Sequence, residues 1–396
     1  MSLKCLIVLS FFYVFDIQAQ TDSRSNLTIY GFIKMDAGYN FKTIDPNYYD
    51  VMRTSKLPSY KGEYAPDGKI YYSVRATQFG VKSSTPTKFG DLNTYFEFEL
   101  FGSGEDVGQT AFRLRKAYGE LGKFGAGQYW SVFMDSDIYP NILDKFGPPG
   151  MLWYRNIQIR YTPITGDSRL TFGLERPGFS ADGGVFTERI ELSEVKPQYY
   201  LPDFTGNFRY GSKWGYVQLA GLVKFIKWVP NIDTSFSVGG NAFCWGGGLT
   251  STIKINENND LLLSGFYGKG IGNYVNDSPA DIGAELDLSN INQPVKGIPL
   301  PVTGLIAFLN HRWSSYFTSS AGYSMLKVEN SNALPLTAFN RGQYAVANLI
   351  YYPANNFMTG IEYQWAERKN NSGFISTDTK IQFSVKVNFQ KLFSWD

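Results

Sequence analysis

Apolar and polar side chains alternate along most of this chain with a period of two residues. In residues 92–101, Phe96 and Phe98 share one face of an extended segment, while Glu97 and Glu99 share the other. The pattern recurs to the end of the chain, so most segments read as strands with one apolar and one polar face. The composition agrees with this, because 17% of the residues are aromatic although the mean hydropathy is only -0.22.

The connections between the predicted strands alternate between long and short. Long ones fall at 40–68, 132–154, 177–202 and 271–298, with short ones such as 85–89 between them. A barrel in an outer membrane has tight turns at one rim and extended loops at the other, whereas a soluble sandwich has no reason to keep this order. The strands are expected at 27–39, 69–84, 91–101, 110–121, 124–131, 155–163, 168–176, 203–212, 214–226, 239–255, 260–270, 299–310, 314–326, 340–352, 355–368 and 379–393.

The sequence therefore predicts an all-β fold, a 16-stranded antiparallel transmembrane β-barrel. Its third long loop, at 132–154, is expected to fold inward. Residues 1–20 carry Lys4 before a short apolar run, which is typical of a cleaved signal peptide. A transmembrane helix is the alternative, but Asp16 interrupts the run. Residues 21–396 are expected to form the barrel as one domain. The expected location is the bacterial outer membrane, with outer-membrane lipids around the barrel.

Several classes of function lack the residues that they would need. The formal net charge is +2, without the clustered basic face that binding to nucleic acid requires. His311 is the single histidine and is predicted in a short turn, whereas a hydrolase would need it on the barrel wall beside a serine. Cys244 is the single cysteine after residue 20, and packing is its expected role. We predict no catalytic residues, no cofactor and no metal.

Arginines gather on the polar faces of the predicted strands. Arg113 and Arg115 share one face of a strand, Arg160 lies on the polar face of a later strand, and Arg75 and Arg169 are further candidates. Guanidinium groups inside a narrow lumen attract carboxylates and phosphates, so these side chains are candidate pore-lining, anion-binding residues. The alternative is that they pair with acids and brace the wall. The acids in question are Glu97, Glu99, Glu120 and Glu175.

The long connection at 132–154 contains several prolines and glycines, which stiffen it and suit a segment that narrows a pore. Asp135, Asp137 and Asp144 in this segment are expected to face the arginines across the lumen as a constriction loop. A calcium loop is the alternative, suggested by the spacing of Asp135, Asp137 and Asn141. It lacks the central glycine and the final glutamate of the EF-hand pattern.

Specific segments of the chain resemble a known family. They include IYGFIKMDA at 29–37, SVRATQFGVKSSTP at 73–86, residues 113–135, WYRNIQIRYTP at 153–163 and residues 348–368. In these segments the chain is similar to the DcaP-like family of trimeric outer-membrane porins. The resemblance implies a homotrimer of sixteen-stranded barrels, with the third long loop folded inward, that passes small anionic solutes such as dicarboxylates.

The same resemblance implies a basic ladder at Arg113, Arg115, Arg155 and Arg160. Two functions follow from the sequence as a whole. The first is a porin for passive diffusion of small polar solutes, favouring anions at an arginine-lined constriction. The alternative is a binding or adhesion barrel that recognises a ligand through its long outer loops, the first of which is rich in tyrosine.

Overall fold

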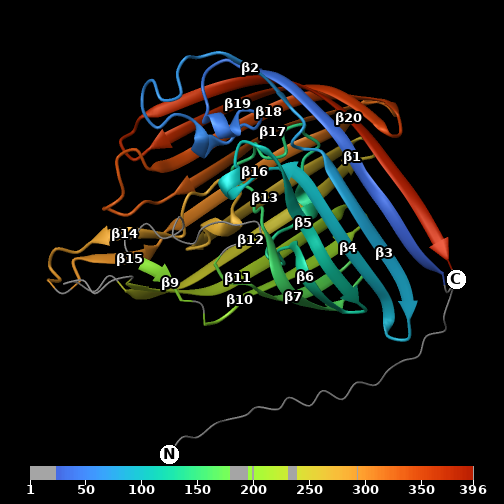
Figure 1. The fold of residues 1–396 in the computed structure, drawn as a ribbon, viewed down its shortest axis with the longest axis horizontal. Helices are drawn as coiled ribbons and strands as arrows, with labels where there is room; N and C mark the ends of the chain where they lie inside the picture. The colour runs from blue at the N-terminus through green and yellow to red at the C-terminus, as the bar shows by residue number, and fades with distance from the viewer. Residues whose placement is uncertain (1–23, 179–194, 199, 231–238, 292, 396) are drawn as a thin grey trace, which may run out of the picture.

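The structure is a computed structural model of the chain. Its sheet closes on itself, because β20 (Ile375–Trp395) pairs antiparallel with β1 (Ser25–Asn40). The result is a closed antiparallel barrel of sixteen wall strands (Figure 1), which confirms the predicted all-β, 16-stranded antiparallel barrel. Within the part of the chain that is described, no helix has the length and hydropathy needed to cross a bilayer. The described residues are 24–178, 195–198, 200–230, 239–291 and 293–395.

The other wall strands follow one another around the ring in chain order, and each pairs antiparallel with the next. Each of the sixteen ranges expected from the sequence overlaps one wall strand. The signal peptide predicted at 1–20 lies outside the described residues. The remaining wall strands are β3 (Gln78–Thr87), β4 (Gly90–Phe101), β5 (Thr110–Leu121), β6 (Phe124–Trp130), β7 (Arg155–Ile164), β8 (Arg169–Glu175), β10 (Asp203–Ser212), β11 (Gly215–Pro230), β12 (Gly240–Asn256), β13 (Asn259–Lys269), β16 (Pro301–Arg312), β17 (Phe317–Val328), β18 (Phe339–Ala354) and β19 (Phe357–Asn370).

The two rims of the barrel differ. The start of β1 and the end of β20 lie at the same rim as the tight turn between β3 and β4 (Figure 1). The long connections, including the hairpin of β14 (Ile282–Leu286) and β15 (Val295–Pro299), lie at the opposite rim. In outer-membrane barrels the short turns face the periplasm and the long loops face outward.

The alternation seen in the sequence separates the two faces of the wall. On β19, Ile361 and Tyr363 are exposed, whereas Glu362 and Gln364 are almost completely buried. Because a membrane barrel turns its apolar side chains toward lipid, the exposed apolar face is the outer face of the wall. The buried polar face lines the interior.

The predicted strand at 69–84 is interrupted. β2 (Lys69–Ser73) and β3 pair with different parts of β1, and residues 74–77 form a turn between them. Arg75 lies in this turn, where its guanidinium binds the carboxylate of Asp50. This tertiary interaction accounts for the break, since it draws the chain away from the sheet.

Three further short strands lie in segments expected to be loops. β14 and β15 form their own hairpin within the connection 271–298, and β9 (Val195–Pro197) pairs with the end of β11. The prediction that His311 lies in a turn is wrong. His311 is in β16, with its Nδ1 2.8 Å from Asn259 Oδ1, and the turn follows at 313–316.

Candidate constriction site

The third long connection, which follows those at 41–68 and 102–109, comprises residues 131–154 between β6 and β7 and is here called the third connection. It is hydrogen-bonded to strands in a distant part of the ring. The backbone N–H groups of Leu143 and Asp144 donate to the Glu362 carboxylate of β19 at 2.6 and 3.0 Å. The Asp144 carboxylate forms an ion pair with Lys380 of β20 at 3.0 Å, and both side chains are buried. These contacts fix the middle of the connection against the polar face of the opposite wall.

The first connection, residues 41–68 between β1 and β2, contacts the third. The Met52 N–H donates to Asp144 at 2.7 Å, and Lys380 donates to the Asp50 carbonyl oxygen at 3.1 Å. Asp144 and Lys380 therefore hold both connections to β20 at one point.

A separate set of contacts holds the first connection to the segment between β13 and β16. Asp277, between β13 and β16, accepts hydrogen bonds from the Thr54 hydroxyl at 2.7 Å and the Ser55 N–H at 2.8 Å. It also forms an ion pair with Arg53 at 3.2 Å. Since Asp277 is buried and has several donors, it ties the first connection to the connection that follows β13.

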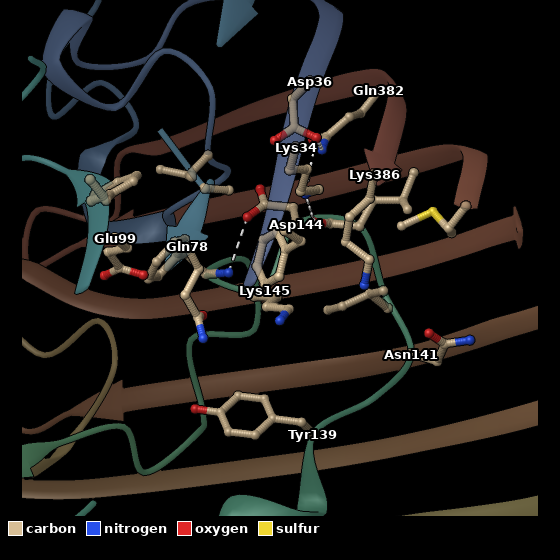
Figure 2. A pocket seen from close by; sticks show the side chains of 18 of the residues that line it. Lys34, Asp36, Gln78, Glu99, Tyr139, Asn141, Asp144, Lys145, Gln382 and Lys386 are labelled. Atoms are coloured by element: carbon tan, nitrogen blue, oxygen red, sulfur yellow. Dashed lines mark hydrogen bonds and ion pairs between the residues drawn. The ribbon is translucent and has the colours of Figure 1, made fainter. Parts of the chain in front are cut away.

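A cavity of about 320 Å³ lies where the first and third connections meet the wall. Lysines from three elements point into it: Lys34 from β1, Lys145 from the third connection and Lys386 from β20 (Figure 2). Lys34 is engaged, because it forms an ion pair with Asp36 at 3.0 Å and donates to the Leu143 carbonyl at 2.8 Å.

The other two lysines are placed differently. The Nζ atoms of Lys145 and Lys386 lie 5.7 and 5.2 Å from the centroid of the Phe32 ring. Among the described residues neither ammonium has an acid within ion-pair distance, and Lys145 is solvent-exposed. Desolvation inside the barrel and the neighbouring cations Arg115, Lys386 and Lys34 lower the pKa of Lys145 to about 7, so a nearby anion favours its charged form.

Acids also line the cavity, but each is already bound by a cation. The lining holds four acids and four cations, but three of the acids pair with cations outside the lining. Lys145 and Lys386 are therefore left without an acid partner among the described residues. The pairs are Asp36 with Lys34, Asp50 with Arg75, Asp144 with Lys380, and Glu99 with Arg113 and Arg115.

Aromatic rings complete the wall of the cavity. The Trp153 ring centroid lies 4.5 Å from that of Tyr139 and 5.4 Å from that of Phe146. Burial raises the pKa of the Tyr139 hydroxyl well above its ordinary value, so this group stays neutral. The rings thus bound the cavity without adding charge.

Three of the arginines predicted to line the pore meet at one acid. Arg113 and Arg115 both bind Glu99, and Arg155 lies 3.5 Å from the same carboxylate. Arg115 also binds Glu97 at 2.8 Å and lines the cavity. The pairing with wall acids that the sequence offered as the alternative is thus present at all three arginines, and their role as anion-binding residues stays a prediction.

Arg75 does not line the lumen, which corrects the prediction. Its side chain is fully buried between the rings of Tyr49 and Phe101, whose centroids lie 4.8 and 4.3 Å from Cζ. The carboxylate of Asp50 binds it there. Arg75 therefore holds the first connection against the wall.

Arg160 and Arg169 lie on the polar face away from this cavity. Arg160 donates to the Trp130 carbonyl and to the Gln158 side chain at 2.5 and 2.8 Å. Arg169 stands opposite Arg209 in the pairing of β8 with β10. Neither has an acid within ion-pair distance in the described part of the chain.

The acids predicted to face Arg113, Arg115 and Arg160 bind other partners. Asp135 and Asp137 both accept from Arg209 of β10, and Asp144 binds Lys380. These acids therefore form their ion pairs with cations of β10 and β20, and the expected field across the lumen stays a prediction. Within the described residues no group of His, Cys, Asp and Glu side chains is arranged to hold a metal.

The sequence reasoning missed the lysines of the cavity. Lys34 and Lys386 lie on the polar parity of their strands, so the alternation placed them inside, but nothing in the pattern distinguished them from other lumen residues. Lys145 lies in an irregular segment, and its position depends on contacts such as that of Asp144 with Lys380. No periodic signal could have found it.

Several solved structures have a fold similar to that of this chain. The solved structure of the outer membrane channel DcaP of Acinetobacter baumannii matches with a TM-score of 0.77 at 20% identity, over 92% of this chain and 97% of that chain. An anion-selective porin from Comamonas acidovorans matches with a TM-score of 0.57 at 10% identity, over 92% and 100%. OmpT of Vibrio cholerae, in its trimer form, matches with a TM-score of 0.53 at 11% identity, over 92% and 99%.

Because all three sequence identities are low, these structures establish the fold of the chain and nothing about its solutes. No curated protein matches the sequence. The model of the family described as DcaP outer membrane protein matches residues 16–389, which is nearly the whole chain. The chain therefore belongs to the DcaP outer membrane protein family.

Proposed function

We propose that this outer-membrane channel favours small anions, and that Lys145 and Lys386 form its selective point. The single observation that carries the proposal is the pairing of charges at the cavity: among the described residues these two ammonium groups have no acid partner, whereas every lining acid has a cation. A narrow lumen with an excess of one sign of charge concentrates ions of the other sign.

The solute class proposed is small carboxylates, including dicarboxylates. Two ammonium groups beside one aromatic ring offer attraction for two carboxylates, and the ring accepts a short apolar spacer between them. The third connection narrows the pore in this proposal, and Arg115 adds positive charge at the edge of the cavity. The porin from Comamonas acidovorans, which has a similar fold, is anion-selective, which supports the proposal.

The predicted homotrimer also remains a proposal. OmpT of Vibrio cholerae, whose fold is similar, has a solved trimer form. The cavity described above is built from residues of one chain. Anion preference at Lys145 and Lys386 therefore does not require a second subunit.

The proposal can be tested by swelling of proteoliposomes. For the intact protein we expect faster entry of succinate than of its uncharged diamide, which has a similar size. In the variant Lys145→Gln with Lys386→Gln this ratio should fall about fivefold for each lysine, since one charge at ~4 Å in water is worth about 1 kcal/mol.

The matched control is Lys82→Gln, which removes an exposed lysine of β3 on the polar face outside the cavity. Its effect on the ratio should be much smaller. Equal entry of succinate and the diamide into vesicles with the intact protein would refute anion preference. A normal preference in the double variant would refute the assignment to Lys145 and Lys386, and so would an equal loss in the control.

A further inference from the structure

The outer face of β17, β18 and β19 carries charged side chains near the long-connection rim. In the strand register Lys327 stands opposite Arg341, and Arg341 stands opposite Lys369. Three cations thus occupy directly opposed positions on neighbouring strands. Like charges in this arrangement destabilise a sheet, so an anion bound outside the wall would stabilise these three positions.

Acids on the same face offset only part of this charge. Glu367 pairs with Arg341 at 3.0 Å, and Glu329 pairs with Lys327 at 3.3 Å in an exposed contact of little strength. Lys369 has no acid within ion-pair distance among the described residues. Lys269 of β13 is a fourth cation on the outer face near this rim, and it too lacks an acid within ion-pair distance in the described part of the chain.

The depth of the row in the membrane follows from strand geometry. At the short-turn rim Phe317 and Tyr351 stack on the outer face, with ring centroids 4.7 Å apart. Arg341 is ten positions away from Tyr351 along β18. At about 3.3 Å per residue and a tilt of about 40°, this separation spans about 25 Å, which is the height of the apolar band of such barrels.

The side chains between these two levels are consistent with that placement. Leu349 on β18 and Ile361 on β19 are apolar and exposed, as a lipid-facing surface requires. The cations therefore begin where the apolar band ends, at the level of the lipid headgroups. Long basic side chains at this level extend their charge into the headgroup region.

We propose that Lys269, Lys327, Arg341 and Lys369, here named the outer cation row, bind the phosphate groups of an anionic glycolipid in the outer leaflet. Phosphates supply the charge that the row lacks, and Arg341 offers paired donors to them. The row lies on the opposite side of the wall from the cavity. This inference does not depend on the anion preference proposed for the channel.

The test uses the purified full-length protein in nanodiscs of phosphatidylethanolamine. Phosphorylated lipopolysaccharide is titrated in one arm and the same lipid after enzymatic dephosphorylation in another. For the variant combining Lys269→Gln, Lys327→Gln and Lys369→Gln, affinity for the phosphorylated lipid should fall on the order of 100-fold, which is about fivefold per cation. Arg341 is kept so that Glu367 retains its partner.

The matched control is Lys391→Gln, an exposed lysine near the opposite rim on β20, which should bind the glycolipid normally. Anion preference of the triple variant should be unchanged, because the substituted side chains point away from the lumen; this also shows that the variant folds. Three results would overturn the proposal: tight binding of the dephosphorylated lipid, full competition by free inorganic phosphate at the same phosphate concentration, or unchanged binding by the triple variant. A change of oligomeric state without glycolipid would likewise overturn it, since the row would then contact protein.

Discussion

Lys380 and Asp144 form an ion pair that is almost completely shielded from solvent. Removing two charges from water is costly, and this pair repays the cost through further hydrogen bonds from Met52 and to the Asp50 carbonyl. Breaking such a pair leaves one buried charge without its partner. The pair is therefore a point at which one substitution affects both the first and the third connection.

We predict that Lys380→Met destabilises the protein by about 3 kcal/mol, because loss of one partner from a buried pair typically costs this much. The measurement is the free energy of unfolding by urea in phospholipid vesicles. The control Lys391→Met alters an exposed lysine of the same strand and should change this free energy by less than about 0.5 kcal/mol.

A double-mutant cycle separates the pair from general effects of the substitution. In the Lys380→Met background, Asp144→Asn should cost much less than it does in the intact protein, because its charge has already lost its partner. Additive losses would show that the two side chains do not act together.

At the scale of elements, parity along the strands was sufficient to predict the wall. The range 110–121 expected from alternation coincides with β5, Thr110–Leu121. Irregular positions were not predictable in this way. A bulge between β4 and β5 leaves Arg115 outside the paired register, so Lys116 also reaches Glu97, although simple alternation would turn it outward.

The connections were less predictable than the strands, because their paths depend on tertiary contacts. The sequence singled out the third connection by its length and composition, but not the side chains that it meets on β19 and β20. It did not identify Arg209 and Lys380 as the ion-pair partners of the acids in this connection, since partners across the barrel depend on register and loop path together. The alternative of an adhesion barrel drew partly on the connection 177–202, most of which lies outside the described residues.

The first connection provides a prediction at this scale. Asp277→Ala removes its hydrogen bonds with Thr54 and Ser55 and its ion pair with Arg53. We expect larger current fluctuations in the open state, because residues 41–68 then lose one of their anchors beside the cavity. Single-channel recording measures this directly.

The control for that experiment is Asp287→Ala, which alters a partly exposed acid beside the β14–β15 hairpin. Its current noise should match that of the intact protein. If Asp277→Ala were equally quiet, the first connection would not depend on this anchor.

At the scale of the whole molecule, the barrel wall separates two kinds of surroundings. The inner face carries the ion pairs of the cavity together with Lys145 and Lys386, which have no acid within ion-pair distance in the described part of the chain. The outer face carries an apolar band bordered by the outer cation row. The same period-two alternation produces both faces, because neighbouring side chains on a strand point to opposite sides. Selectivity and lipid contact can therefore be altered independently by substitutions on the two faces.

The most direct test of the central claim is the zero-current potential of the channel in a planar bilayer under a tenfold gradient of KCl. The intact protein should give a potential of the sign set by chloride, and the variant Lys145→Gln with Lys386→Gln should give one shifted strongly toward zero. A potential of the sign set by potassium in the intact protein, or the same chloride preference in both proteins, would contradict the claim that these two lysines make the channel favour anions.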